Sequence, residues 1–154
     1  MTEYPMVSVC VPAFNHRRFI EDCVQSVSAQ QYPNLEIVIR DDCSDDGTWE
    51  YLETLHDRRV RVTRNAQRLG IARNWNAAVE DASGELLVML PSDDVLMPDH
   101  IATLSEIMTA KPNLGFVGTA VDFIHPSGVV VGGRFRRGLT PGMLEVNTGE
   151  RRIV

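Results

Sequence analysis

Two periods of hydrophobic and polar residues alternate along the chain, and together they predict strands that alternate with helices. Short apolar runs, which are typical of buried strands, stand at 7–11, 35–39, 60–63, 86–90 and 115–124. Apolar residues three or four positions apart predict helices that follow the first, third and fourth runs. These helices are expected over 17–30, 71–79 and 98–108, and a short helix is expected over 48–55. A turn at 125–128 and the apolar run 129–131 predict a hairpin.

This order of elements predicts an α/β fold. Strands that alternate with helices form a mostly parallel, Rossmann-like sheet with right-handed crossovers and helices on both faces. The run 86–90 is apolar on both faces, as expected for a central strand. Ligands of such sheets bind at the carboxyl ends of the strands. The loops 12–16, 41–47 and 91–97 are therefore the candidate functional loops.

Composition and charge limit the classes of protein to which this chain can belong. The 154 residues are enough for one domain, and 44% of them are hydrophobic, which is ordinary globular usage. Residues 1–125 hold 10 Lys and Arg against 19 Asp and Glu, which argues against binding to nucleic acid. Residues 126–154 hold five Arg against two Glu. This basic segment could contact anionic lipid or another part of a longer protein, or it could simply be solvated.

Three cysteines without Cys-x-x-Cys spacing predict neither a disulfide framework nor a zinc site. The longest apolar run has five residues, and no signal peptide is recognisable at the amino terminus. These features favour a cytoplasmic protein, with peripheral contact at the inner face of the membrane left open.

Two of the candidate loops carry paired acids, Asp41-Asp42 and Asp93-Asp94. Two unit charges 4 Å apart repel by roughly 4 kcal/mol at an effective dielectric of 20, so a cation or hydrogen-bond donors should compensate them. Mg²⁺ and Mn²⁺ take oxygen ligands and commonly bridge carboxylates to substrate phosphates. The neighbouring pair Asp45-Asp46 is expected instead to cap the helix that begins near Thr48.

Three strand-and-loop segments carry a family resemblance. Segments 7–15 (VSVCVPAFN), 30–48 (QQYPNLEIVIRDDCSDDGT) and 84–94 (GELLVMLPSDD) closely resemble, in order and spacing, the family-2 glycosyltransferases of GT-A fold. Segments 61–65 (RVTRN) and 70–74 (GIARN) are similar to the third strand and following helix of that family. The resemblance covers about residues 5–125.

The resemblance implies roles for individual residues. Pro12, Ala13 and Phe14 would lie against the nucleotide base, with Phe14 stacked on it, and the alternative for Phe14 is a core aromatic. Asp42 would accept the N–H of the base, while Asp41 would orient the loop. Arg73 would approach the diphosphate, unless it forms a surface ion pair. Asp93 would contact the ribose, and Asp94 would bind Mg²⁺ or Mn²⁺.

The chain also departs from the family pattern. Pro91 stands where the family usually has an acid, and Phe14 stands where Tyr is usual. The half of the family that binds the acceptor and supplies the general base lies beyond the matched segment, so no catalytic base is assigned. We therefore expect a nucleotide-sugar-binding GT-A domain over 1–133, and over 134–154 a basic tail that begins an absent acceptor-side region.

The implied function is glycosyl transfer with inversion. A sugar would pass from a nucleotide diphosphate donor, a UDP-sugar by expectation, to a hydroxyl of a glycan or lipid-linked acceptor in cell-envelope polysaccharide synthesis. Two alternatives stay open, a non-catalytic nucleotide-binding module and an inactive fragment of such an enzyme. A receiver-like signalling domain is disfavoured, because Pro12-Ala13 rather than acids follow the first strand and the single Lys is Lys111.

Overall fold

A parallel sheet of five strands, in the order β3-β2-β1-β4-β5, forms the centre of the protein. The computed structural model describes residues 4–119, 121–125, 127–131 and 152–153. The strands are β1 (Val7–Ala13), β2 (Leu35–Asp41), β3 (Val60–Arg64), β4 (Leu86–Met89) and β5 (Arg152–Ile153). Every strand pair runs parallel, so the predicted α/β sheet is confirmed.

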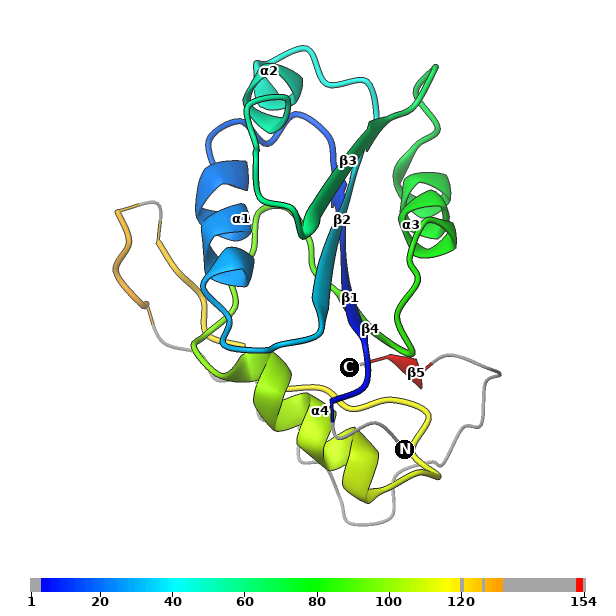
Figure 1. Ribbon diagram of the computed structural model, residues 1–154. Coiled ribbons are helices and arrows are strands. Elements are labelled where there is room, and N and C mark those ends of the chain that lie inside the picture. The colour runs from blue at the N-terminus through cyan, green and yellow to red at the C-terminus, as the bar shows by residue number, and fades with distance from the viewer. Residues whose placement is uncertain (1–3, 120, 126, 132–151, 154) are drawn as a thin grey trace.

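Helices cover both faces of this sheet (Figure 1). α1 (Ile20–Ser28) and the short α2 (Thr48–Leu52) lie on one face, and α3 (Ile71–Glu80) lies on the other. α4 (His100–Ala110) follows β4 and packs at the end of the sheet where the strands begin. No helix among the described residues has both the length and the apolarity to cross a membrane.

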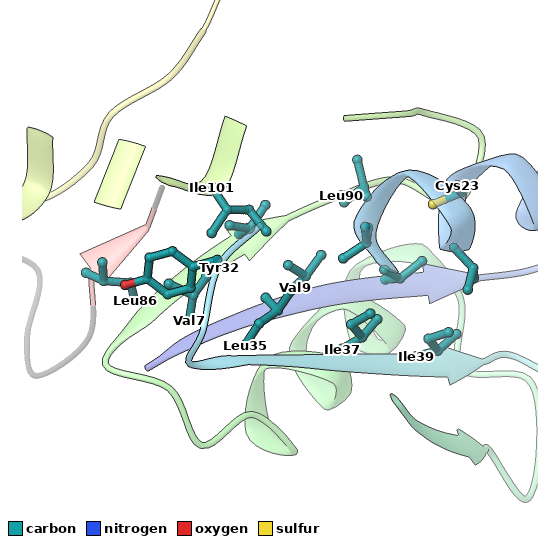
Figure 2. Packing of buried hydrophobic residues seen from close by; sticks show 14 of the residues in the cluster. Val7, Val9, Cys23, Tyr32, Leu35, Ile37, Ile39, Leu86, Leu90 and Ile101 are labelled. Carbon is teal, nitrogen blue, oxygen red and sulfur yellow. The ribbon is translucent and has the colours of Figure 1, made fainter. Parts of the chain in front are cut away.

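Alternating strand residues build one hydrophobic cluster on each face. Val9 and Ile37 face the larger cluster with Val24 of α1 and Ile101 of α4, as Figure 2 shows in part. Cys10, Val38 and Leu87 face the smaller cluster with Ala78 and Ala82. Because β1 and β2 are buried on both faces, their near-continuous apolar sequence is what a central parallel strand requires. Cys10 and Cys23 are buried core residues, as expected, and none of the three cysteines, all within the described residues, forms a disulfide.

β1 is the strand that fixes the register of its neighbours. Val9 lies opposite Ile37 of β2 and opposite Val88 of β4. At the carboxyl end, Asp42 N–H donates to Ala13 O at 2.9 Å and Leu90 N–H donates to Cys10 O at 3.0 Å. The loops that follow β1, β2 and β4 consequently open on the same edge of the sheet.

The structure differs from the sequence prediction after α4. The described residues of 115–124 form no strand, and the predicted hairpin is reduced to a single antiparallel bridge between Ile124 and Val130. Val117 packs against the larger hydrophobic cluster, but Phe123 and Val130 are 55% and 58% exposed, so the later part of this segment lacks the burial that a core strand would have. Residues 132–151 lie outside the described residues. Arg152–Ile153, within the segment expected to be a tail, pairs with β4 as an unpredicted fifth strand.

The turn into β4 leaves no space for a side chain at Gly84. A Cβ atom there would lie 2.6 Å from Ser8 Oγ, 2.7 Å from Ser8 N and 2.8 Å from Met6 O. Gly84 N–H also donates to Ser8 Oγ at 2.7 Å. The close approach of two backbones at this point therefore depends on glycine.

Gly84→Ala should lower the free energy of unfolding by about 2 kcal/mol or more, because the added methyl group meets backbone atoms that cannot move aside cheaply. Urea denaturation followed by circular dichroism measures the change. Gly118→Ala is the matched control, since nothing lies within 4 Å of a Cβ atom there. Equal stability of the two variants would contradict this account of the turn.

Candidate functional site

A cleft of about 240 Å³ opens at the carboxyl edge of the sheet. The loops after β1, β2 and β4 and the segment that enters α3 all contribute to it, which agrees with the position expected for a ligand site in a parallel sheet. The residues that line it are Pro12, Ala13, Phe14, His16, Asp42, Arg68, Gly70, Ile71, Asn74, Trp75, Pro91, Ser92 and Asp93.

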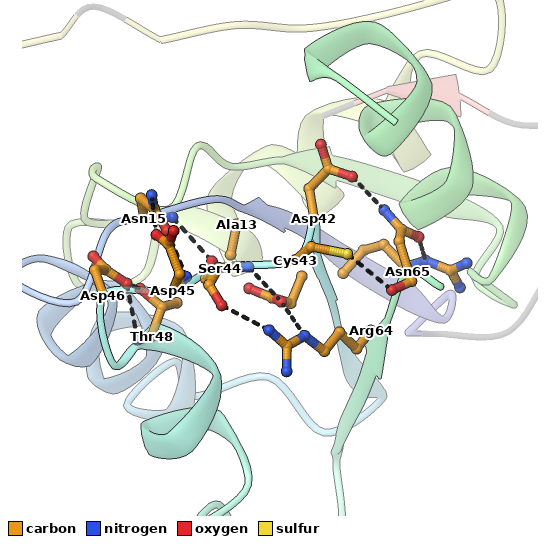
Figure 3. Close-up of polar contacts among 12 residues, drawn as sticks. Ala13, Asn15, Asp42, Cys43, Ser44, Asp45, Asp46, Thr48, Arg64 and Asn65 are labelled. Atoms are coloured by element: carbon orange, nitrogen blue, oxygen red, sulfur yellow. Dashed lines mark hydrogen bonds and ion pairs between the residues drawn. The ribbon is translucent and has the colours of Figure 1, made fainter. Parts of the chain in front are cut away.

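The loop after β1 turns sharply at Asn15, which has a φ of 52°. Asn tolerates this left-handed conformation better than most residues. Its backbone N–H donates to Ser44 Oγ at 2.9 Å, and its amide side chain exchanges two hydrogen bonds with Asp45 (Figure 3). These contacts hold the β1 loop against the β2 loop and direct Phe14 and His16 into the cleft.

Asp46 fixes the other end of the β2 loop. Its carboxylate accepts hydrogen bonds from the backbone N–H and the hydroxyl of Thr48, at 3.0 and 2.6 Å. It also accepts the Arg17 N–H at 2.9 Å. Asp46 thus binds the start of α2, which is the capping role that the sequence predicts for the pair Asp45-Asp46. Gly47 is the N-cap residue by its backbone position.

The two acids of the first doublet point in different directions. Asp41 is fully buried, accepts the Ser44 N–H at 3.0 Å and forms an ion pair with Arg64 at 3.2 Å. It therefore orients the β2 loop, the role expected for it. Asp42 lines the cleft although only 2% of its surface is exposed (Figure 3).

Asp42 organises the segment that enters α3. Its Oδ1 accepts the Leu69 N–H at 2.7 Å and the Asn65 amide at 2.8 Å, and its Oδ2 accepts the Gly70 N–H at 2.8 Å. Gly70 has a φ of 84°, a conformation that favours glycine, and it is the N-cap residue of α3. A carboxylate offers about four lone-pair positions, so three donors leave one acceptor position on Oδ2.

The pKa of Asp42 is lowered from its ordinary value of 3.8. Burial of the carboxyl acts to raise the pKa, but the hydrogen bonds from Leu69, Asn65 and Gly70 together outweigh it, with a further contribution from the charge of Arg68. Hydrogen bonds to the charged form favour that form. Asp42 is therefore an anion at neutral pH, which is the state that can accept another N–H donor.

An aromatic ring and a guanidinium stand together at the mouth of the cleft. The Cζ atom of Arg68 lies 3.9 Å from the centroid of the Phe14 ring, a cation–π contact. Phe14 is partly exposed and lines the cleft, so its alternative role as a buried core aromatic is not observed. Trp75 of α3 lines the same space.

The second doublet lies on the loop after β4. Asp93 lines the cleft, whereas Asp94 is not among its lining residues. The pKa of Asp94 is raised by desolvation of its carboxyl and then by the negative charge of Asp93. Because a nearby positive charge favours the ionised carboxylate, it would offset both effects on Asp94.

A divalent cation would fit this doublet through the chemistry of its donors. Within the described part of the chain, no group of three or more His, Cys, Asp or Glu side chains could hold a metal ion. The protein thus offers two carboxylates here, and Mg²⁺ is commonly bound by one or two carboxylates together with substrate phosphates. The oxygen ligands and the unrelieved negative charge suit Mg²⁺ or Mn²⁺.

Five of the seven site residues predicted from the sequence line the cleft. Pro12, Ala13, Phe14, Asp42 and Asp93 share one cleft. Arg73 is exposed on α3 and does not line it, and Asp94 adjoins Asp93 without lining it. The roles assigned to all seven stay predictions.

Sequence reasoning missed several cleft residues. Arg68 and Trp75 line the cleft but belong to none of the three candidate loops. His16 lies in the candidate loop 12–16, but it was given no role. The one usable signal was Gly70, because a glycine just before a helical pattern marks a backbone turn next to Arg68.

A second cavity, of about 450 Å³, lies beside α4 near the amino-terminal ends of the strands. Glu106 is the single charged residue in its lining, which otherwise consists of Tyr4, Tyr32, Ala102, Ser105, Thr109 and Ala110. Although this cavity is larger, it contains neither acid doublet, and the chemistry of the first cleft is the more specific.

Comparison with known families gives one match that covers most of the chain. Residues 8–142 match the family described as Glycosyl transferase family 2. A putative teichuronic acid biosynthesis glycosyltransferase, TuaG of Bacillus subtilis, is 40% identical over 109 residues, which are 70% of this chain and 43% of that protein. Chondroitin synthase of Pasteurella multocida is 34% identical over 128 residues, 82% of this chain and 13% of that protein. The chain thus spans less than half the length of either relative.

Solved structures share the fold. The mannosyltransferase PcManGT from Pyrobaculum calidifontis, solved in complex with GDP-Man and Mn²⁺, aligns with a TM-score of 0.68 at 30% identity, covering 79% of this chain and 37% of that one. TarS of Staphylococcus aureus, in complex with UDP-GlcNAc, aligns with a TM-score of 0.66 at 24% identity, covering 75% of this chain and 36% of that one. The predicted GT-A fold is confirmed.

Asp42→Asn should lower the free energy of unfolding at neutral pH by about 1–3 kcal/mol, because an amide cannot accept the Leu69, Gly70 and Asn65 donors together. Since the pKa of Asp42 is lower in the folded state than its ordinary 3.8, the wild-type advantage should be complete above that pH. It should shrink as the pH falls through the lower, folded-state pKa.

Urea denaturation of both proteins at pH 7 and at pH 3 measures this difference. Asp22→Asn, at an exposed position on α1, is the matched control and should change stability little. A stability difference between wild type and Asp42→Asn that does not depend on pH would refute the proposed role of the carboxylate charge.

Proposed function

Because the chain belongs to glycosyl transferase family 2, we propose that it binds the nucleotide of a sugar donor, a UDP-sugar, in the cleft at the carboxyl edge of the sheet. The observation that carries the proposal is that Phe14, Asp42 and Asp93 line one cleft although they follow three different strands. In the longer proteins of this family that the chain matches, the bound donor would pass its sugar to an acceptor hydroxyl with inversion.

The base would lie against Phe14. Stacking of a base on an aromatic side chain is typically worth ~1–3 kcal/mol. The remaining acceptor position on Oδ2 of Asp42 would receive the imide N–H of a uracil, since its other acceptor positions are used by Leu69, Gly70 and Asn65. Pro12 and Ala13 would contact the base through the backbone that precedes Phe14.

The negative charge of the diphosphate needs a positive counterpart in an acidic protein. Arg68 lines the cleft beside Phe14 and can turn its guanidinium from the ring to phosphate oxygens. Arg73, which is exposed in the first turn of α3, remains the second candidate. Asp93 would contact the ribose and Asp94 would hold Mg²⁺ or Mn²⁺. When bound, such a metal acts as a Lewis acid on the leaving diphosphate.

The likeness to PcManGT, whose structure contains GDP-Man and Mn²⁺, supports a nucleotide-sugar donor and a divalent metal. That protein takes a guanine nucleotide, so the base itself must be tested. The teichuronic acid assignment of TuaG supports cell-envelope polysaccharide synthesis as the setting, with a glycan or lipid-linked acceptor at the inner face of the membrane.

Isothermal titration of the folded protein with UDP and with GDP, each with and without Mn²⁺, tests the proposal. We expect UDP to bind, more tightly than GDP, with an affinity that Mn²⁺ raises. Asp93→Asn combined with Asp94→Asn should abolish the effect of Mn²⁺ while leaving metal-free UDP binding unchanged or stronger, because two negative charges are removed. No heat with either nucleotide, with or without the metal, would eliminate the proposed function.

Phe14→Ala should weaken UDP binding by about tenfold or more through the loss of stacking. Phe14→Tyr is the matched control, because it keeps the ring and should bind UDP within about threefold of wild type. The same titration measures both variants. Equal affinities of the alanine and tyrosine variants would show that the base does not stack on residue 14.

A non-catalytic nucleotide-binding module is the second candidate, since the chain covers 43% of TuaG. Such a module would bind UDP without transferring sugar. Release of UDP from a UDP-sugar by this chain, in the presence of Mn²⁺ and an acceptor, would exclude it.

A further inference from the structure

His16 joins the β1 loop to the acidic loop after β4, and sequence reasoning assigned it no role. Its backbone N–H donates to Thr48 Oγ1 at 3.0 Å, and its carbonyl accepts the N–H groups of Phe19 and Ile20 at 2.9 Å each. Its ring packs edge-on against Phe19, with 6.1 Å between the centroids. Because backbone and ring are both held, the direction of the imidazole is fixed by the fold.

The fixed ring meets the second acid doublet. His16 Nδ1 lies 2.7 Å from Ser92 Oγ, a hydrogen bond, and 4.0 Å from Asp93 Oδ1. Ser92 is 1% exposed, so its hydroxyl needs a partner inside the protein. His16, Ser92 and Asp93 all line the proposed nucleotide cleft.

The contact between His16 and Ser92 helps to hold the loop after β4 in place. Pro91 lacks a backbone N–H, so it cannot be tied by a donor of its own. Its carbonyl accepts the Asp94 N–H at 3.1 Å, which closes a turn around Ser92 and Asp93, and it accepts the Cys23 thiol of α1 at 3.6 Å. The hydrogen bond between His16 and Ser92 attaches the same turn to the β1 loop on the cleft side.

The geometry excludes a nucleophilic relay among the three residues. In a Ser-His-Asp relay the imidazole uses one nitrogen for the acid and the other for the hydroxyl. Here Ser92 Oγ and Asp93 Oδ1 both face Nδ1. The arrangement suits a residue that sets the direction of a carboxylate rather than one that moves a proton between two partners.

We propose that His16 is a positioning residue, which holds Ser92 so that Asp93 is aimed into the cleft where a divalent cation and a diphosphate would meet. This inference rests on the proposed function. It concerns the contacts of the β4 loop, which are the metal site and the ribose contact of Asp93, because His16 acts through this loop and not through Phe14 or Asp42.

Three substitutions of His16 separate its two ring nitrogens. The amide of His16→Asn stands where Nδ1 stood and can still bond Ser92, whereas the amide of His16→Gln stands where Nε2 stood. His16→Ala removes both. We expect the Ala and Gln variants to lose on the order of fivefold to tenfold in UDP affinity measured with Mn²⁺, the size of one hydrogen bond. The Asn variant should stay within about twofold of wild type.

Titration calorimetry with UDP, with and without Mn²⁺, and electron paramagnetic resonance of free Mn²⁺ provide two readouts that do not depend on turnover. In the Ala and Gln variants, metal-free UDP affinity should fall by less than the affinity with Mn²⁺, because without the metal Asp93 contributes its ribose contact alone. A general loss of structure would lower both affinities alike. Ser92→Ala should reproduce the loss, and His16→Ala with Ser92→Ala should be no worse than either single variant.

His125→Ala is the matched control. His125 also bonds a serine, with 2.8 Å between its Nδ1 and Ser127 Oγ, but it lies in an exposed turn outside the cleft. It should bind UDP and Mn²⁺ as wild type does. If wild type binds neither nucleotide nor Mn²⁺, the proposed function is rejected and this inference with it. If wild type binds and His16→Ala keeps the full effect of Mn²⁺, or the losses of the two single variants add in the double variant, the positioning role alone is rejected.

Discussion

The parallel pairing of β1 with both β2 and β4 is the constraint on which the site depends. Asp42 and Asp93 are separated by a third of the 154-residue chain, yet each follows a strand that pairs directly with β1. Hydrogen bonds at the strand ends, from Asp42 N–H to Ala13 O and from Leu90 N–H to Cys10 O, set how far each loop reaches past the sheet. A change of register in either pair would carry one acid away from the other.

In each acid doublet, one residue lines the cleft and the other does not. Asp41 is buried against Arg64 and holds its own loop, while Asp42 faces the cleft and holds the loop before α3. In the second doublet Asp93 faces the cleft and raises the pKa of Asp94 beside it. Donors compensate the charge of the first doublet within the protein. The carboxylates of the second doublet have fewer donors around them, and this difference is why the proposed cation is assigned to it.

The sequence was sufficient to predict the elements whose burial follows from the pattern of neighbouring residues. The strands at 7–11 and 35–39 and the apolar face of α4 follow from short-range patterns, and the structure confirms them. The pattern over α3 was less informative. Ile71 is 82% exposed, while Asn74 is buried and donates to the backbone of Arg40 at 3.0 Å. A polar network beneath a helix leaves no hydrophobic signal, so it could not be predicted from periodicity.

The same limit explains why the sequence pattern did not identify Arg68 as a cleft residue. Acid pairs at strand ends are visible in a sequence because strand order places them, but Arg68 reaches the cleft only because Asp42 binds the backbone of the two residues after it. Arg73, chosen for its position in a family-like segment, is exposed instead. The strand expected at 115–124 failed for a different reason, since a β-type sequence forms a strand only where a partner and a buried face exist.

Paramagnetic broadening of backbone amide signals by Mn²⁺ in the presence of UDP tests the central claim most directly. If the strand-end loops share one nucleotide site, broadening should be strongest at residues 92–95 and should extend to Phe14, His16 and the amides of Leu69 and Gly70. Broadening centred instead beside Tyr4, Tyr32 and Glu106, at the second cavity, would contradict the account.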